Sequence, residues 1–263
     1  MTEPERVSDE EAQRFLAEHA DYDEDIDFWR RAAAALGGPV LDLGCAAGRV
    51  ALPLARDGHT VWALDASDAM LAALDVACQT TPIVGTGRVK TVRADLTTFT
   101  LDQTFPLVFC SMNTLQVLID PHDQRTFLER VRHHLHPGGE FIFDVILPDL
   151  GEIASRLGQL LQVGATIDES SGRSLMRWAC YEDFDPISQT ADILTIVDEF
   201  EPGEPLRRRT RRHRVHLFLP SELLHLLALS GLEVIEILGD FDGAPVEAVS
   251  QRQIYRCRRA ELP

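Results

Sequence analysis

Apolar and polar residues follow one another in blocks that predict strands and helices in turn. Between residues 40 and 146, short apolar runs such as PVLDLG and TVWALD are separated by stretches with helical spacing, such as DAMLAALDVACQ. Runs that are apolar throughout are typical of parallel strands buried on both faces and joined by right-handed crossovers. The pattern therefore predicts an α/β fold, with helices on both faces of a largely parallel sheet.

A helix is expected before the first strand. The segment DYDEDIDFWRRAAAAL (21–36) places Ile26, Trp29 and Ala33 on one apolar face, and Gly37-Gly38-Pro39 ends it. The first 20 or so residues, which are rich in acids, are expected to form a loosely held helix.

The pattern changes after residue 150. LGEIASRLGQLL predicts one more helix, and three strand-like runs follow it with turn-forming segments between them: SLMRWACYEDF, QTADILTIVDEF and PLRRRTRRHRVHLF. These runs predict an antiparallel meander, after which the pattern returns to a helix and two strands. We therefore expect a core made of residues 1–150 and 217–263, with an N-terminal lid helix, and an insert of a helix and antiparallel strands over 151–216.

Composition and charge restrict the class of protein. The 263 residues are 45% hydrophobic, which suits one large globular domain or one domain with an insert. A net charge of −17 repels phosphate backbones and anionic lipid surfaces, so neither nucleic acid nor a membrane is expected as a partner. The five cysteines form no CxxC pair, and the first residues, MTEPERVSDEE, are too polar for a signal peptide. We expect free thiols and a cytoplasmic protein.

The stretch VLDLGCAAGRVALPLARDGHTVWALD (40–65) predicts a nucleoside-binding site. A glycine directly after a strand allows a sharp turn and lets a ligand approach the main chain. Asp65 ends the next strand 21 residues after Gly44, where a carboxylate can accept hydrogen bonds from ribose hydroxyls. A dinucleotide loop, G-x-G-x-x-G, would need glycine where the chain has Ala46 and Arg49. S-adenosylmethionine has no phosphate and tolerates a different loop, in which Asp42 would help to fix its ammonium group.

These motifs resemble those of class I S-adenosylmethionine-dependent methyltransferases. VLDLGCAAGRVALPLA is similar to their first motif and keeps its acid and two of its glycines, with Ala46 at the middle glycine. Alanine is expected to fit there with a negative φ. VWALDASDAMLAAL resembles the second motif and VRADLTTF the third, which implies that Asp65 binds the ribose and Asp95 the adenine amino group.

The resemblance extends over roughly residues 20–260. FPLVFCSMNTLQVL is similar to the fourth motif, where methyl transfer occurs, and HLHPGGEFIFDV to the fifth. The C-terminal part and DYDEDIDFW resemble a small-molecule subgroup with a late antiparallel insert and an N-terminal helix that closes over the cofactor. The resemblance implies a Rossmann-like seven-stranded sheet and S-adenosylmethionine as cofactor. The cofactor-binding residues that it implies are Tyr22, Asp42, Gly44, Cys45, Ala46, Gly48, Arg49, Asp65, Ala66, Met70, Asp95, Leu96 and Ser111.

Residues on the acceptor side are open to two interpretations. Asn113 and Gln116 follow the fourth strand, where they could orient an acceptor or cap the loop, and His213 could act as a base. The arginine run 207–214 could guard an exposed edge strand, pair with acids or bind an anion. The histidines at 133, 134 and 136 point in different directions on a helix, so we expect solvated side chains and no metal site. The remaining acceptor-side candidates, which could equally serve packing, are Trp29, Trp178, Tyr181 and Arg214.

Three functions are compatible with the sequence. The first is a methyltransferase for a small-molecule acceptor, acting by in-line transfer, with N-methylation favoured over O-methylation because no dependable base is evident. The second is a protein of the same fold that binds S-adenosylmethionine but catalyses a rearrangement or cyclisation, or regulates a partner. The third is a nicotinamide oxidoreductase, against which the missing middle glycine and Arg49 both count. An exposed insert edge would also suit a homodimer.

Overall fold

The computed structural model describes residue 19 and residues 22–80, 83, 85–167 and 172–261. The expected acidic helix over the first 20 residues lies almost wholly outside the described residues. The chain divides into two compact units, one within residues 1–115, 120–146 and 220–263 and the other made of 116–119 and 147–219. None of the described helices is long and apolar enough to cross a membrane.

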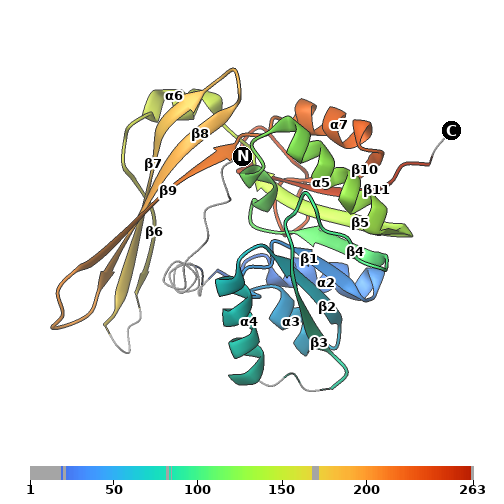
Figure 1. Cartoon of the computed structure of the whole chain (residues 1–263). Coiled ribbons are helices and arrows are strands. Elements are labelled where there is room, and N and C mark those ends of the chain that lie inside the picture. Colours follow the sequence, from blue (N-terminus) through green and yellow to red (C-terminus); the bar gives the residue numbers. More distant parts are fainter. Residues whose placement is uncertain (1–18, 20–21, 81–82, 84, 168–171, 262–263) are drawn as a thin grey trace. The chain divides into compact units, whose positions relative to one another are not determined.

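The first unit contains a seven-stranded sheet with the strand order β10-β11-β5-β4-β1-β2-β3 (Figure 1). The strands from β1 to β5 are parallel, and β11 runs antiparallel between β5 and β10. The predicted α/β class is therefore confirmed. The strands are β1 (Val40–Leu43), β2 (Thr60–Asp65), β3 (Arg88–Arg93), β4 (Phe105–Cys110), β5 (Leu135–Ile146), β10 (Leu232–Leu238) and β11 (Arg252–Arg259).

This unit also contains helices α2, α3, α4, α5 and α7. Helix α2 shows how an apolar helix face packs against the sheet. Trp29 is fully buried and stacks on Phe109 of β4, with 4.9 Å between the ring centroids. Phe28 and Phe241 pack beside it. The helices are α2 (Ile26–Leu36), α3 (Ala51–Arg56), α4 (Asp68–Thr80), α5 (Pro121–His134) and α7 (Pro220–Leu229), and the 3-10 helix η1 (Thr114–Val117) lies where the chain leaves this unit.

The second unit is a four-stranded antiparallel sheet in the order β6-β7-β8-β9, preceded in the chain by α6 (Leu150–Arg156). The long strands β7 and β8 are joined by a short turn over residues 186–189, and β8 and β9 by a longer loop over residues 201–206 (Figure 1). A small apolar cluster holds α6 to the sheet through Ile153, Ala191 and Val215. The strands are β6 (Leu161–Ile167), β7 (Ser174–Asp185), β8 (Thr190–Phe200) and β9 (Arg207–His216).

The structure corrects the expected start of this sheet. The helix predicted over LGEIASRLGQLL ends at Arg156, and the residues that follow form a fourth strand, β6. Gly158 has a φ of 75°, a left-handed conformation that a continuing helix does not allow, and its N–H donates to the carbonyl of Tyr181 at 2.8 Å. The chain therefore turns at Gly158 and enters the sheet.

Candidate active site

The carboxyl ends of β1, β2, β3, β4 and β5 meet at one edge of the first unit's sheet, because these strands are parallel. The loop after β1 is tied to β2 there: the N–H groups of Gly44 and Cys45 both donate to the carbonyl of Leu64, at 2.8 and 2.9 Å. Open α/β sheets hold their ligands at this edge. The first motif, the second motif and the fourth strand are therefore brought together as the sequence predicts.

Both glycines of the loop are required by their surroundings. Gly44 and Gly48 have φ angles of 75° and 85°, in the left-handed region that favours glycine. A Cβ at Gly44 would lie 2.4 Å from Cγ2 of Thr114, and one at Gly48 would lie 2.3 Å from Cδ1 of Leu74. Any side chain at either position would displace its neighbour and change the shape of the loop.

Ala46 departs from the conformation expected for it. Its φ is +45°, not negative, so the alanine occupies a left-handed conformation that usually belongs to glycine. Its N–H donates to Oδ2 of Asp65 at 2.9 Å. This hydrogen bond joins the middle of the first motif to the acid of the second.

Asp65 is held at the end of β2 by main-chain donors. Its Oδ1 accepts from the N–H of Ser67 at 2.8 Å, and its Oδ2 accepts from Ala46. Burial raises the pKa of this carboxyl, and the neighbouring N–H groups act in the opposite direction. Each carboxylate oxygen has more than one lone pair, so Asp65 keeps capacity to accept the two hydroxyls of a ribose.

Asp42 is the most unusual acid of this edge. It lies on β1 with 1% of its surface exposed, and within the described part of the chain its Oδ1 is buried without a hydrogen-bond partner. The pKa of Asp42 is raised to about 8: burial is the main cause, Arg49 opposes it, and the charges of Asp65 and Asp25 add to it. A buried carboxylate without a partner is costly unless a cation or donor satisfies it. The ammonium group of an amino-acid ligand has the right charge for this position.

Arg49 is engaged by protein groups. Its guanidinium forms a two-pronged ion pair with Asp25, which has no exposed surface, and the Nη2–Oδ2 distance is 2.6 Å. The indole N–H of Trp29 donates to the same carboxylate at 2.8 Å. The guanidinium also lies over the ring of Tyr22, 5.0 Å from its centroid. Arg49 thus joins the glycine loop to the residues that precede and begin α2.

Tyr22 finds the polar partner that its hydroxyl needs in Arg252 of β11, whose Nη1 donates to it at 3.1 Å. Burial raises the pKa of the tyrosine. Neither Asp25 nor Arg252 could be singled out from the sequence. Asp25 stands in a run of acids, and Arg252 lies on a strand with three other arginines, so neither has a local signal that separates it from similar neighbours.

Residues of the second and third motifs lie at the ends of β2 and β3. Met70 is buried beside Ala46 and Ala47, and its N–H donates to Oγ of Ser67 at 3.2 Å, while Ala66 is exposed next to Asp65. Asp95 is exposed, and its Oδ1 accepts from the N–H of Thr97 at 2.7 Å and from the Thr97 hydroxyl. Within the described residues its other oxygen accepts no hydrogen bond, so it can accept one from a ligand. Leu96, which follows it, is half-buried, and Cys45 is buried with a raised thiol pKa.

The end of β4 carries a strained turn. The carbonyl of Ser111 accepts from the N–H of Thr114 at 3.3 Å and from its hydroxyl at 2.7 Å. The two residues between them, Met112 and Asn113, have φ angles of 55° and 60°. Asp144 of β5 accepts from the N–H of Met112 at 2.9 Å. The side chain of Asn113 is half-buried beside this turn.

For Trp29 and Gln116 the structure favours the second of the two interpretations, a structural role. Trp29 is packed inside the core of the first unit, where it has no surface for an acceptor. Gln116 is 1% exposed and belongs to the second unit, where its Nε2 donates to the carbonyl of His216 at 2.8 Å. Each side chain is committed to packing or to a structural hydrogen bond.

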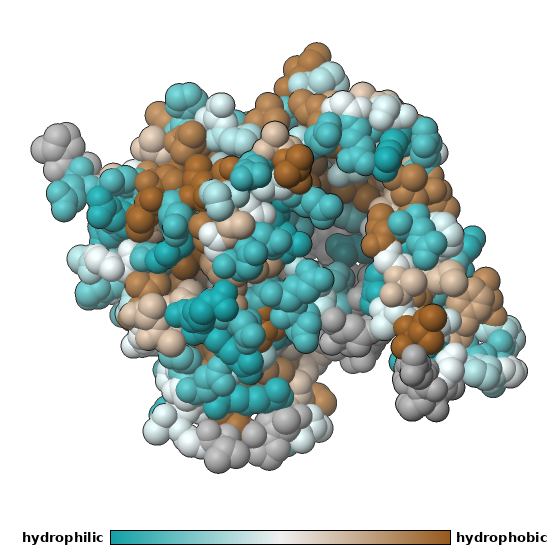
Figure 2. Space-filling view, turned by 180° about the vertical axis from the view of Figure 1, so that it is seen from behind, coloured by the Kyte–Doolittle hydropathy of each residue, from teal (hydrophilic) through white to brown (hydrophobic). Residues whose placement is uncertain are grey.

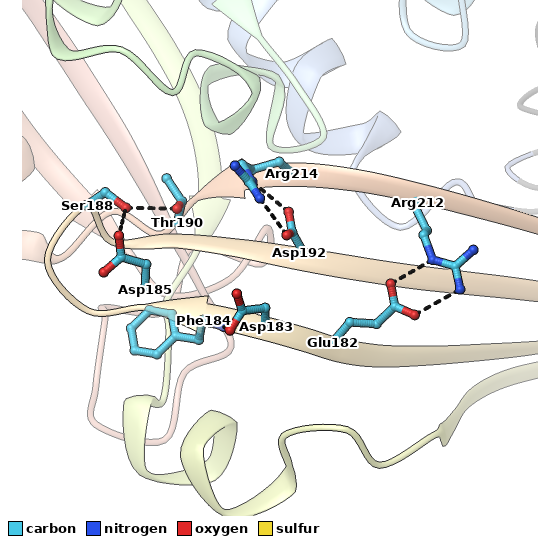
Figure 3. Close-up of polar contacts among 9 residues, drawn as sticks. All are labelled: Glu182, Asp183, Phe184, Asp185, Ser188, Thr190, Asp192, Arg212 and Arg214. Atoms are coloured by element: carbon cyan, nitrogen blue, oxygen red, sulfur yellow. Dashed lines mark hydrogen bonds and ion pairs between the residues drawn. The ribbon is translucent and has the colours of Figure 1, made fainter.

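The remaining acceptor-side candidates belong to the second unit. Burial lowers the pKa of His213 to about 4, so the ring is neutral and weakly basic. Tyr181 packs against the cluster around Ile153, and Trp178 is half-buried on the same strand. Arg214 forms a two-pronged ion pair with Asp192, with both N–O distances 2.6 Å (Figure 3). Arg214 therefore has an acid partner of its own.

Comparison with known proteins agrees with this geometry. A family described as a methyltransferase domain matches residues 40–139. The cypemycin N-terminal methyltransferase of a Streptomyces species is 26% identical over 233 residues, which are 85% of this chain and 84% of that protein. The structure of the CcbJ methyltransferase from Streptomyces caelestis is 27% identical with a TM-score of 0.73, over 92% of this chain and 98% of that one. The sugar N-methyltransferase KedS8 from a Streptoalloteichus species is 19% identical with a TM-score of 0.67, over 95% of this chain and 92% of that one, and shows the shared fold.

The chain is an S-adenosylmethionine-dependent methyltransferase: residues 40–139 match the methyltransferase domain, and most of the chain is similar to known methyltransferases. The first motif of this methyltransferase lies within the matched residues, as do Asp65 and Asp95. S-adenosylmethionine is its cofactor, and the site fits that ligand: among the described residues one buried carboxylate oxygen of Asp42 has no partner, and the sequence has no phosphate-binding G-x-G-x-x-G here. The comparisons thus favour methyl transfer over nicotinamide chemistry.

Proposed function

We propose that this methyltransferase transfers a methyl group to nitrogen of a small-molecule acceptor. In this proposal the carboxyl ends of β1, β2 and β3 hold the cofactor, and residues 151–216 form the acceptor side and lid. The observation that carries the cofactor position is the buried Oδ1 of Asp42, which has no partner among the described residues. The N–H groups that orient Asp65 support the same position.

The protein's own task in this reaction is placement. Bound S-adenosylmethionine supplies an activated methyl group on a sulfonium, with a neutral thioether as the leaving group. Asp42 would balance the ammonium group, and Asp65 would bind the ribose hydroxyls. The walls of the site would align the acceptor with the methyl group and keep water out.

Nitrogen is favoured as the acceptor atom for a chemical reason. A neutral amine carries its own lone pair and can lose its proton to solvent after transfer, whereas an alcohol needs a base during the step. His213, the base candidate from the sequence, is a weak base, with its pKa near 4. The net charge of −17 also favours a cationic or neutral acceptor. The names of two similar proteins, cypemycin N-terminal methyltransferase and sugar N-methyltransferase KedS8, support nitrogen.

Calorimetry tests the cofactor site. S-adenosylmethionine and S-adenosylhomocysteine are titrated into the protein and into Asp65→Ala, which we expect to bind at least roughly tenfold more weakly, since two ribose hydrogen bonds are lost. Asp68→Ala is the matched control, because Asp68 lies three residues away with 74% of its side chain exposed. Equal affinities for Asp65→Ala and the parent, or no binding to the parent, would refute the site.

Transfer of a labelled methyl group tests the acceptor class. The cofactor with a tritiated methyl group is incubated with a panel of primary and secondary amines and with matched alcohols and phenols. We expect label in amines, with cationic or neutral amines labelled faster than those that carry carboxylates. Label confined to hydroxyl compounds would contradict the proposal.

We also propose a cytoplasmic homodimer. All five cysteines are free, which suits a reducing compartment. The second unit's sheet has β6 and β9 at its edges, and such edges can pair with another chain. Light scattering after size-exclusion chromatography distinguishes a mass near 29.3 kDa from one twice as large.

A further inference from the structure

The turn after β4 adopts a conformation that its residues disfavour. Met112 and Asn113 both have left-handed φ angles, 55° and 60°, and the N–H of Thr114 closes the turn on the carbonyl of Ser111. Two such angles in succession are typical of a type I′ turn, in which glycine or asparagine is preferred. Asparagine suits the second position, but methionine at the first has a Cβ that opposes it. Something outside the turn must hold this conformation.

Asp144 supplies the restraint. It lies on β5 with 5% of its surface exposed, one residue after Phe143, which pairs with Cys110 at the end of β4. Its Oδ1 accepts from the N–H of Met112 at 2.9 Å, and the main chain of Asn113 acts to lower the pKa of this carboxyl. The N–H of the first left-handed residue of the turn thus binds a buried acid, which stabilises the left-handed conformation.

Once Asp144 holds the turn in this conformation, the turn shapes the cofactor loop. The hydroxyl of Thr114 donates to the carbonyl of Ser111 at 2.7 Å, which orients the threonine. Its Cγ2 then lies against Gly44, so closely that a Cβ added there would be 2.4 Å away. A continuous set of contacts therefore runs from Asp144 through the turn and Thr114 to the glycine that opens the first motif.

We propose that Asp144 is a positioning residue for methyl transfer: its carboxylate holds the Met112–Asn113 turn so that Thr114 packs on Gly44 and shapes the cofactor loop. The inference rests on the proposed function, since the loop is taken to bind S-adenosylmethionine. Asp144 itself is not expected to touch the transferred methyl group. Its neighbours from other elements include Asp25, before α2, and Arg252 of β11, which affect its charge.

A double-mutant cycle tests the inference, with the affinity for S-adenosylhomocysteine as its readout. Asp144→Ala in the parent is expected to weaken binding by about tenfold, because the turn relaxes away from its left-handed angles. In a Met112→Gly/Asn113→Gly background the same substitution is expected to change the affinity by less than about threefold, since glycine adopts these angles unaided. Asp144→Asn keeps one acceptor oxygen and should fall between Ala and the parent.

The outcomes distinguish a variant that does not fold, failure of this inference and failure of the proposed function. Thermal unfolding identifies variants that do not fold, and if Asp144→Ala is one of them, the same cycle is read with Asp144→Asn. An equal loss of affinity in both backgrounds would show that Asp144 acts through general stability, and an unchanged affinity would show that it has no effect; either overturns the inference. A parent protein that fails to bind S-adenosylhomocysteine would instead overturn the proposed function.

Discussion

Ala46 carries a conformational cost within the first motif. Its φ of +45° disfavours alanine, whereas glycine adopts this angle readily. We therefore expect Ala46→Gly to raise the free energy of unfolding by about 1 kcal/mol, measured by urea denaturation. Ala47→Gly is the matched control, because Ala47 is buried and is not among the described non-glycine residues with positive φ.

The control should move in the opposite direction. Glycine at position 47 adds backbone freedom to the unfolded chain and removes a buried methyl group, so a loss of about 1 kcal/mol is expected. If Ala46→Gly destabilised the protein as much as Ala47→Gly, the left-handed conformation of Ala46 would be wrong.

Asp42 makes the stability of the cofactor-free protein depend on pH. Its pKa is about 8 in the folded protein, well above the ordinary value for an aspartate. Between pH 4 and pH 8 the folded state therefore holds a proton that the unfolded state has lost, so the contribution of Asp42 to stability falls as pH rises through this range. We expect Asp42→Asn to gain roughly 2 kcal/mol or more over the parent when pH is raised from 5 to 8.

Urea denaturation of the two proteins at both pH values measures this difference. Asp68→Asn serves as the control, because Asp68 is an exposed acid and should show no such gain. The same Asp42→Asn variant should bind S-adenosylmethionine more weakly, since a neutral amide cannot balance an ammonium group. A difference between parent and Asp42→Asn that stays constant with pH would mean that Asp42 is ionised in the cofactor-free protein.

At the scale of elements, the Arg49–Asp25 pair joins the start of α2 to the loop after β1. Asp25 is fully buried and Arg49 is 15% exposed, so removal of the cation leaves a buried carboxylate whose described donor is Trp29. We expect Arg49→Met to lower the free energy of unfolding by about 3–5 kcal/mol. Arg30→Met is the matched control on α2 itself, because Arg30 pairs with Asp57 at the surface, with 43% and 40% of the side chains exposed.

The control variant should lose no more than about 1 kcal/mol, since exposed ion pairs contribute little. Asp25→Asn combined with Arg49→Met should be less destabilised than the sum of the single variants, because no unpaired charge is then left buried. Urea denaturation of these variants shows whether the Arg49–Asp25 pair behaves as a buried or as an exposed ion pair. Equal losses for Arg49→Met and Arg30→Met would show that the pair at Asp25 is not buried.

Most elements could be predicted from the sequence because their patterns are local. The apolar runs that end at Leu43, Asp65 and Cys110 are strands, and helix α5 begins with Pro121 after its capping residue Asp120. The strand β6 was not predicted, because the run LGQLL follows a helix and has a composition that is also typical of a helix. Gly158 was the available signal, since glycine near a helix end commonly adopts a left-handed angle.

The site could be predicted only in part, for a physical reason. Gly44 and Asp65 are specified by their place at strand ends, whereas Asp25, Asp144 and Arg252 gain their surroundings from elements far away in the chain. His134 shows the same limit. It was expected on the surface but is buried, where its Nε2 accepts from the N–H of Leu101 at 2.8 Å. Which member of a polar cluster is buried depends on packing that one sequence does not reveal.

At the scale of the whole molecule, the question is whether the arginine run of β9 offers free positive charge to a ligand. The surface seen in Figure 2 mixes hydrophilic and apolar residues, and the chain as a whole is strongly acidic. Along β9, arginines are neutralised across the sheet: Arg212 pairs with Glu182 and Arg214 with Asp192 (Figure 3), and Arg208 pairs with Asp198. Two-pronged pairs of this kind leave little free positive charge for a polyanion.

We therefore expect no measurable binding of a labelled single-stranded oligonucleotide at 0.1 M salt, followed by fluorescence anisotropy. Removal of the acid partners should change this result, because Glu182→Gln with Asp192→Asn leaves two arginines unpaired and raises the local charge. Any binding gained in this way should disappear again in Arg212→Ala/Arg214→Ala and fall steeply with salt. If the parent already bound the oligonucleotide through these arginines, the paired charges would not be neutralising the run, and the preference for a cationic or neutral acceptor would lose its electrostatic basis.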